Sequence, residues 1–241
     1  MLPAPTAWPT IGISNNLATY AVGTVMAEAL IVDPIGRNTY ADCGIWSDAH
    51  VPALKRIVDF LHRQGSLAAA QLHHCGPKAS RRRPWQGLGR LDAEDTAKGK
   101  PPWQPVSASA EASLVGWLQP RSLTIEEIRK LVEDYRQSSR RAAEADFNVL
   151  EIHGAHDYLL HTFLSPIANR RRDAYGGDIN GRMRLALEIV ERVRTAWPLG
   201  KPLFFPHLGG RLARGSRCGP TAGRSRTAAC LRASLPLAGL I

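Results

Sequence analysis

The chain has 241 residues, of which 44% are apolar and 22% charged, an ordinary composition for a globular protein that excludes intrinsic disorder as the default. No apolar run reaches the roughly 18 to 20 residues that cross a bilayer, and the opening MLPAPTAWPTIG lacks a secretory pattern, so we expect a cytoplasmic protein without a membrane partner. Cys43, Cys75, Cys218 and Cys230 have neither disulfide-framework nor zinc-finger spacing and are predicted to be free thiols.

The net charge of +10 is unevenly distributed along the chain. Residues 206–241 contain six arginines and no lysine, aspartate or glutamate, so they carry six of the ten net charges. This Arg/Gly/Ala-rich tail has few apolar side chains to offset the cost of ordering it. We predict that it is disordered or comes from a shifted reading frame. A basic nucleic-acid-binding module is a minor alternative that rests on the tail alone.

In chain order, the first predicted strand is Thr24–Val32, where TVMAEALIV is almost wholly apolar. An amphipathic helix is predicted between the cap Ser47 and Gly65, because apolar residues recur there at helical spacing. The strand Leu67–Leu72 follows. The segment from Gly76 to Ser122 lacks periodicity and is too long for a simple connection, which predicts a functional loop after that strand.

The second half repeats the pattern. Thr124 and Glu127 form a capping box ahead of a long amphipathic helix. The strand Asn148–Ile152, the helix Asn180–Trp197 and the strand Pro202–Phe205 come next. Short apolar strands that alternate with helices of roughly 15 to 20 residues predict parallel βα units, so the expected fold class is α/β.

Directly after the strand Asn148–Ile152, the stretch EIHGAHDYLLHTFLSP groups His153, His156, Tyr158 and His161. No HExxH signature is present and the third imidazole is eight residues from the first, which disfavours a metal site. Packed or surface histidines without a ligand are a second interpretation. Because residues at the carboxyl ends of parallel strands face the active site, we favour a third, in which His153 and His156 donate hydrogen bonds to developing negative charge and Tyr158 donates a proton.

Other polar residues carry weaker signals. Gln71 ends a strand and its amide can both donate and accept, which suits the edge of a flavin or pyrimidine, but capping of nearby backbone groups is equally favoured. Ala29 is a small residue that would let a flat ring approach. The arginines at 170–172 could contact an anionic ligand, but a solvated face or ion pairing to Asp173 is favoured. Those at 81–83 have the same structural interpretation, with contacts to an NADPH phosphate or a substrate as the alternative.

Three blocks resemble the Old Yellow Enzyme family of FMN-dependent oxidoreductases, particularly its bacterial ene-reductase branch. They are GIWSDAHVPALKRIV (44–58), QLHHCGPKAS (71–80) and EIHGAHDYLLHTFLSPIANRRRDAYGGDINGRMRLALEIV (151–190). The resemblance implies a partial TIM (β/α)8 barrel over residues 17–205, with the first half to two thirds of the barrel represented. It also implies FMN reduced by NAD(P)H, and hydride transfer to an α,β-unsaturated carbonyl.

By position, the resemblance assigns His153 and His156 to the pair that grips the substrate oxygen and Tyr158 to the tyrosine that protonates the α-carbon. Ala29 and Gln71 match positions that contact the flavin ring. Hydrogen bonds to the carbonyl oxygen would stabilise enolate-like charge. The expected partner is a small enone-like molecule rather than nucleic acid, and a homo-oligomer is compatible with this assignment.

The sequence also departs from the family pattern. Residues 1–16 do not resemble the family's first strand, Pro206 stands where an arginine is expected, Asp157 replaces a glycine and Pro77 an arginine. Residues 206–241 lack the loops that hold the phosphate in a barrel. These departures predict a member truncated at both ends that keeps the substrate motif and loses the phosphate anchor. A non-catalytic remnant that no longer binds FMN is the main alternative.

Overall fold

The computed structural model describes residues 23–87, 89–110 and 117–207. Its strands are β1 (Thr24–Met26), β2 (Leu30–Ile31), β3 (Leu67–His73), β4 (Val106–Ser107), β5 (Arg121–Ser122), β6 (Val149–Ile152) and β7 (Leu203–Phe204). Its α-helices are α2 (Val51–Arg63), α3 (Ala93–Ala97), α4 (Ile125–Glu144), α5 (Leu159–Leu164) and α6 (Ile179–Arg194). The divergent segment predicted at 1–16, and the tail beyond His207, lie outside the described residues.

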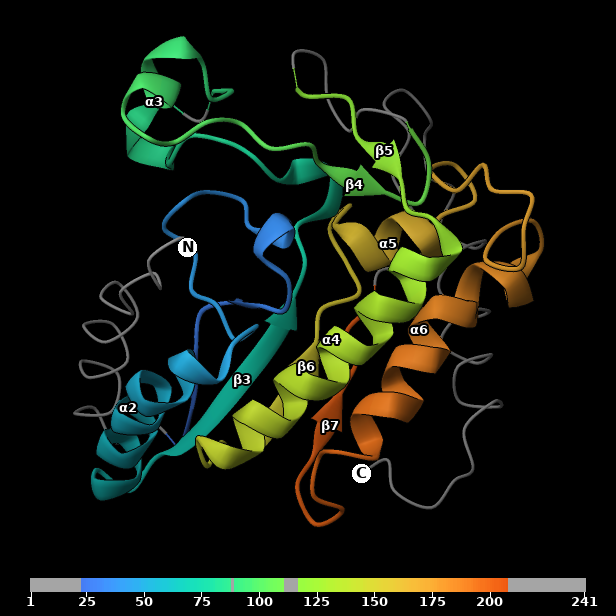
Figure 1. Cartoon of the computed structure of the whole chain (residues 1–241). Helices are drawn as coiled ribbons and strands as arrows, with labels where there is room; N and C mark the ends of the chain where they lie inside the picture. Colours follow the sequence, from blue (N-terminus) through green and yellow to red (C-terminus); the bar gives the residue numbers. More distant parts are fainter. Residues whose placement is uncertain (1–22, 88, 111–116, 208–241) are drawn as a thin grey trace, which may run out of the picture.

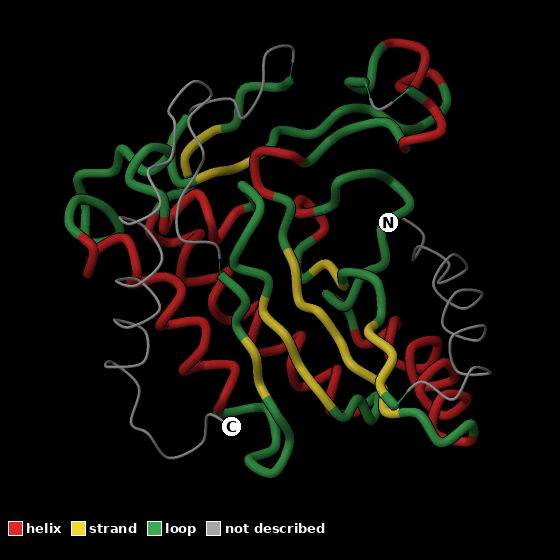
Figure 2. The backbone as a smooth tube through the Cα atoms, turned by 180° about the vertical axis from the view of Figure 1, so that it is seen from behind, coloured by secondary structure: helices red, strands yellow, loops and turns green. Residues whose placement is uncertain are grey.

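The main sheet is entirely parallel, as predicted. Its order is β1, β3, β6, β7, and β2 pairs with β3 beyond the end of β1 (Figure 1). Helices α2, α4 and α6 lie on one face of this sheet, and Figure 2 shows the strands from the other face, in front of the helices. The α/β class is therefore confirmed, and the arrangement is that of part of a βα barrel.

The register of the parallel strands sorts their side chains onto two faces. Three rows point toward the helices and form the core: Val25 with Ala68; Ala70 with Leu150 and Leu203; and Leu30 with Leu72 and Ile152. The next residue along each strand points to the opposite face. There Gln71, Glu151 and Phe204 lie side by side in register, and Met26 and Phe204 are 42% and 49% exposed. Polar side chains therefore share this face of the sheet with exposed apolar side chains.

The single strand predicted over Thr24–Val32 is wrong in one respect, since it is two strands. Met26 pairs with Ala69 and Leu30 with Leu72, so four steps on the first chain segment match three on β3. The extra residue makes a bulge over Ala27–Ala29. Periodicity cannot reveal it, because the interruption arises from pairing with β3 and not from the local sequence.

The long helices largely begin and end where the capping residues in the sequence predict. Thr124 caps α4 through a capping box with Glu127, as predicted, and Gly65 lies just past α2 with a left-handed φ of 79°. The predicted helix end at Trp197 is wrong, because α6 ends at Arg194. The Trp197 indole is buried and its N–H donates to the carbonyls of Lys201 and Pro202, which draws the chain off the helix axis toward β7.

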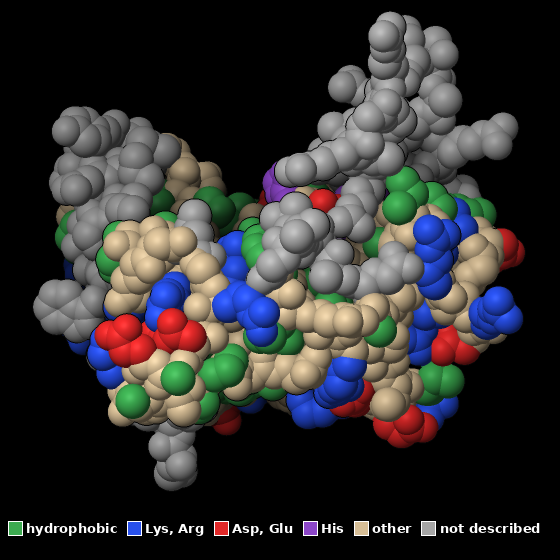
Figure 3. Space-filling model, turned by 90° about the horizontal axis from the view of Figure 1, so that it is seen from above, with side chains coloured by type: hydrophobic (Ala, Val, Ile, Leu, Met, Phe, Trp, Pro, Cys, Tyr) green, Lys and Arg blue, Asp and Glu red, His purple; other side chains and the backbone are tan. Residues whose placement is uncertain are grey.

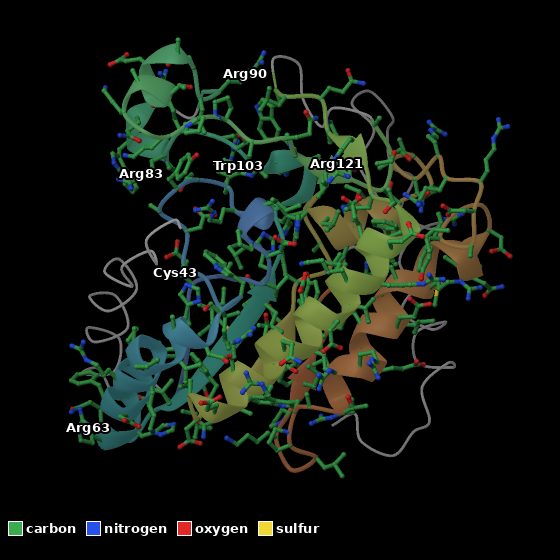
Figure 4. All side chains as sticks on the ribbon, viewed as in Figure 1. Cys43, Arg63, Arg83, Arg90, Trp103 and Arg121 are labelled. Carbon is green, nitrogen blue, oxygen red and sulfur yellow. The ribbon has the colours of Figure 1, made fainter. Side chains whose placement is uncertain are left out.

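The described parts of the segment from Gly76 to Ser122, which are 76–87, 89–110 and 117–122, contain regular elements that the composition does not predict. They include α3, whose cap Asp92 forms a capping box with Asp95, and the short parallel pair of β4 and β5. Trp103 lies where this segment returns over the loop that follows β2 (Figure 4), and its indole N–H donates to the carbonyl of Ile35 at 2.9 Å. The segment is thus tied to the carboxyl end of the sheet.

Candidate active site

The histidine stretch begins where β6 ends. The amide of His153 donates to the carbonyl of Leu72 at 3.0 Å, so His153 is the last residue held by the ladder to β3. Gly154 then bridges to His207 beyond β7, and α5 begins at Leu159. The sequence therefore places these residues correctly at the carboxyl end of a parallel strand. The local conformation is a turn and not a helix.

The structure brings together the three residues predicted to be catalytic. Nε2 of His153 lies 3.3 Å from Nδ1 of His156, and the rings of His153 and Tyr158 are 5.3 Å apart. His153 is buried, Tyr158 half-buried and His156 exposed. The two facing nitrogens are within hydrogen-bond distance of each other, so one imidazole can donate to the other, and this contact holds the exposed ring of His156 against the buried ring of His153.

A fourth ring, His73, belongs to the block QLHHCGPKAS at the end of the second predicted strand, but no role is predicted for it from the sequence. It is buried, 4.8 Å from the ring of His153 and 4.3 Å from the ring of Tyr158, which it meets edge-on. The signal was present, since His73 is two residues beyond Gln71 and therefore on the same face of β3. His73 forms the inner wall of the site.

Burial sets the protonation of this cluster. It lowers the pKa of His153 to about 4, with smaller contributions from His156 and His161, and it lowers the pKa of His73 well below its ordinary value. Burial is also the main cause that raises the pKa of the Tyr158 hydroxyl. Near neutral pH the imidazoles of His73 and His153 are therefore uncharged, and Tyr158 keeps its proton.

Folding stability is expected to fall as the pH drops from about 6.5 to about 4. In that window the unfolded chain protonates His153, whose ordinary pKa is 6.5, while the folded protein holds it neutral down to about 4. The free energy of unfolding should be measured by urea titration at about pH 7 and about pH 4.5. His73→Phe removes one such group and should flatten the pH dependence, whereas equal stability at both pH values would contradict the assignment.

Lys78 was also missed, because nothing in the local sequence marks it. Its Nζ donates to the carbonyl of His156 at 2.7 Å and lies 4.9 Å above the centre of the Tyr158 ring. The ammonium group also contributes to lowering the pKa of His153, after burial and the neighbouring imidazoles. Lys78 thus joins the turn after β3 to the histidine turn after β6.

The histidine turn has an uncommon backbone. His156 and Asp157 both have a φ of 58°, in the left-handed region that disfavours residues with a Cβ. This conformation gives a physical reason for the glycine that the family resemblance expects at position 157. The backbone amide of Asp157 donates to Nδ1 of His161 at 2.8 Å. The Asp157 carboxylate lies 3.1 Å from the same nitrogen, but because that nitrogen accepts the amide proton, it does not donate a hydrogen bond to the carboxylate.

Replacing Asp157 by glycine is expected to raise the free energy of unfolding by about 1 kcal/mol, because glycine adopts a left-handed φ without the Cβ penalty. Urea denaturation followed by tryptophan fluorescence measures the change. Asp157→Ala is the matched variant, since it also removes the carboxylate but keeps the Cβ. If both variants change stability equally, backbone strain is not the cause.

The predicted flavin-contacting residues lie on neighbouring parts of the sheet. Gln71 is in the carboxyl half of β3, and Ala29 lies between β1 and β2, which both pair with β3. The Gln71 amide donates to Oε1 of Glu151 at 2.6 Å, a carboxylate and not the backbone group that the alternative expected. Ala29 ends the bulge between β1 and β2 and is half-buried. Glu151 itself was not predicted, although its alternation with His153 along β6 puts it on the same face.

These residues fit one edge of a flavin ring better than a metal ion. Nδ1 atoms of both His73 and His153 are buried without a hydrogen-bond partner, and Gln71 offers an amide on the same face. Over the described ranges, no three histidine, cysteine or acidic side chains gather around a common point that could hold a metal.

In the arginine runs 170–172 and 81–83, Arg171 and Arg82 form contacts within the protein. Arg171 pairs with Asp173 at 2.6 Å and donates to the carbonyls of Ala108 and Leu123, which supports the structural interpretation of 170–172. Arg82 pairs with two carboxylates on the cap of α3. Seen from above, acidic and basic side chains are interspersed over the described surface (Figure 3). The nucleic-acid alternative rested on the tail and stays an untested prediction.

No described helix is long and apolar enough to cross a membrane. Cys43 and Cys75 are buried and neither forms a disulfide, in agreement with the prediction, and Cys218 and Cys230 lie outside the described residues. Burial raises the pKa of the Cys75 thiol well above its ordinary value. This cysteine is therefore not set up as a nucleophile.

The solved structures most informative for the fold are an Old Yellow Enzyme homologue from Zymomonas mobilis and morphinone reductase. The first has a TM-score of 0.66 at 28% identity and aligns with 81% of this chain and 53% of its own. The second has a TM-score of 0.68 at 28% identity and aligns with 84% and 55%. A further structure shows morphinone reductase in complex with tetrahydroNAD. The partial-barrel prediction is thereby confirmed.

Sequence comparison gives the same assignment. An NADPH dehydrogenase of Listeria innocua is 41% identical over 180 residues, which are 75% of this chain and 47% of that protein. An NADH:flavin oxidoreductase of Gibberella zeae is 41% identical over 183 residues, 76% and 44% of the two chains. The chain thus spans about half the length of these relatives, whose names confirm flavin and NAD(P)H as the cofactors of the family. Old Yellow Enzyme homologues are structural neighbours of this chain. Because residues 14–213 match the family described as NADH:flavin oxidoreductase / NADH oxidase, the chain belongs to that family.

Proposed function

We propose that the chain is an FMN-dependent NAD(P)H oxidoreductase that reduces the carbon–carbon double bond of α,β-unsaturated carbonyl compounds. The observation that carries the proposal is the grouping of His153, His156 and Tyr158 at the carboxyl end of β6, where the two imidazoles are in contact at 3.3 Å and the ring centres of His153 and Tyr158 are 5.3 Å apart. Gln71 and Ala29, on the adjoining strand and bulge, are the residues that would contact the flavin ring.

In this proposal the imidazoles bind the substrate by its carbonyl oxygen. As charge moves onto that oxygen, N–H groups of His153 and His156 stabilise it, an effect of the oxyanion-hole type. Burial keeps the imidazole of His153 uncharged at working pH. Gln71 and Ala29 would hold the ring of FMN, which, when bound and reduced by NAD(P)H, would supply the hydride for the β-carbon.

Tyr158 completes the reduction by donating its proton to the α-carbon. The hydride forms the C–H bond at the β-carbon, the π electrons move toward the oxygen, and the proton forms the second C–H bond, so the product is the saturated carbonyl compound. Burial keeps the Tyr158 hydroxyl protonated, and Lys78 above its ring stabilises the phenolate that remains. Solvent then reprotonates the half-buried hydroxyl.

Three further expectations belong to this proposal. Residues 17–205 form the barrel domain, with FMN and a small enone-like molecule as its ligands and no nucleic acid. A cytoplasmic location agrees with two buried cysteines, Cys43 and Cys75, that form no disulfide. A homo-oligomer would cover apolar side chains on the open face of the sheet, of which Leu67 is 47% exposed.

The proposal is tested by flavin binding and by turnover. Purified chain is titrated with FMN, followed by quenching of flavin fluorescence, and NADPH oxidation is then recorded with and without 2-cyclohexenone. Tight uptake of FMN and enone-dependent NADPH oxidation are expected. A chain that shows neither a flavin band after purification nor uptake of added FMN would refute the proposal.

A non-catalytic chain is the second candidate, and one observation favours it. Met26, Leu67 and Phe204 are large apolar side chains exposed on the sheet face that carries Gln71 and Glu151, where a closed barrel would bury its interior. Such a face lowers the stability of the folded state and of any flavin site built on it. The FMN titration separates the two candidates directly.

A further inference from the structure

Glu151 has no part in the function proposed above, yet it forms a direct contact with a predicted flavin ligand. Gln71 on β3 and Glu151 on β6 are register partners, and Nε2 of Gln71 donates to Oε1 of Glu151 at 2.6 Å. Both side chains are half-buried. The other register partner of Glu151 is the apolar Phe204, which does not compete for the carboxylate.

This contact determines which way the amide of Gln71 faces. A glutamine amide has a donor NH2 group at one end and an acceptor oxygen at the other, whereas an ionised carboxylate only accepts. If the Gln71 amide turned over, its oxygen would meet the carboxylate oxygen of Glu151 and two acceptors would face each other. Glu151 therefore leaves Oε1 and the second N–H of Gln71 for a ligand.

We propose that Glu151 is a positioning residue that fixes the Gln71 amide so that it reads the pyrimidine edge of the flavin. That edge presents an N–H group, N3–H, between two carbonyls. The Gln71 oxygen would accept from N3–H while its remaining N–H donates to the neighbouring carbonyl. The inference rests on the proposed function, because FMN is the ligand. It adds to the family assignment a reason why the Gln71 amide would select a ring edge with an N–H group beside a carbonyl.

The bulge between β1 and β2 also has a role in the proposed recognition of the flavin. The bulge over 27–29 interrupts the ladder opposite Ala70 and Gln71, where β1 has ended and β2 has not yet begun. Ala29 presents only a methyl group there, so a flat ring can approach the strand end beside Gln71. Orientation by Glu151 and space from Ala29 thus act on the same region of the sheet.

The test uses Glu151→Gln, which keeps the size of the side chain but can either donate or accept. In this variant the Gln71 amide is accommodated in both orientations, and if about half of the molecules hold the binding-competent one, FMN binding should weaken by about twofold. Glu188→Gln is the matched control, because Glu188 accepts from the Tyr175 hydroxyl at 2.9 Å on α6, away from this sheet face. It should leave the FMN dissociation constant unchanged.

A spectroscopic measurement identifies the hydrogen bond itself. With ¹⁵N-labelled FMN, the N3–H proton should resonate at lower field in the wild-type complex than in the Glu151→Gln complex, and Glu188→Gln should match the wild type. An unchanged dissociation constant together with an unchanged N3–H resonance in Glu151→Gln would overturn the proposal.

A measurement without flavin separates this inference from the function. In the flavin-free protein, the side-chain amide protons of Gln71, identified by their loss in Gln71→Leu, should show one strongly displaced signal that disappears in Glu151→Gln. Averaged signals in the wild type would refute positioning by Glu151 whatever binds there. If the displaced signal is present but the wild type takes up no FMN, positioning stands and the flavin as its ligand is rejected along with the proposed function.

Discussion

Replacing His156 by alanine is expected to lower turnover with 2-cyclohexenone by a factor on the order of 10²–10³, the usual effect of removing one donor to a developing oxyanion. His156 is exposed, so the substitution opens no cavity, and its Nδ1 lies 3.3 Å from Nε2 of His153. Uptake of FMN should be unaffected, because the proposed ring contacts come from Gln71 and Ala29. Enone-dependent NADPH oxidation at saturating enone measures the effect.

His62→Ala provides the matched control. His62 is a half-buried histidine at the far end of the sheet, where its Nε2 lies 2.7 Å from Oδ1 of Asn148. Its removal should leave turnover unchanged although it costs a comparable hydrogen bond. Wild-type turnover in His156→Ala, with flavin bound, would show that the converging imidazoles are not the oxygen-binding pair.

The βα order was predictable because each unit carries its own local punctuation. Thr124 with Glu127, and Gly65 after α2, mark helix ends through contacts within a few residues, and the structure keeps both. The bulge before Leu30 and the early end of α6 were not predictable, because each depends on a distant partner. The first requires the register with β3, and the second requires the buried Trp197 indole to find the carbonyls that lead into β7.

The same distinction applies to the site. His153, His156 and Tyr158 follow one strand, so position along the chain was enough to group them. Lys78 reaches the carbonyl of His156 across 78 positions of sequence. The Gln71–Glu151 contact spans 80 positions and exists only because β3 and β6 are in register. Pairs of this kind can be anticipated by assuming adjacent parallel strands, but their hydrogen bond cannot.

Gly76 connects the fold to the site, and its replacement by alanine is expected to be the most destabilising of the substitutions considered. Gly76 has a φ of 59°, and a Cβ on it would lie 2.7 Å from both the backbone nitrogen and Cα of Leu159, the first residue of α5. Backbone atoms at the start of a buried helix cannot move aside cheaply. Conformational strain and overpacking together should lower the free energy of unfolding by roughly 3–5 kcal/mol.

Gly65→Ala separates the two costs, because Gly65 has a φ of 79° and nothing lies within 4 Å of an added Cβ. It should lose only the conformational part, about 1 kcal/mol. Urea denaturation gives the loss in free energy of unfolding for Gly76→Ala and for Gly65→Ala, and the difference between the two losses is the steric part. Equal losses would show that α5 is not in steric contact with the turn after β3. Because α5 follows the histidine turn directly, a displaced α5 in Gly76→Ala should also shift Tyr158 and reduce enone turnover, an effect that Gly65→Ala should not share.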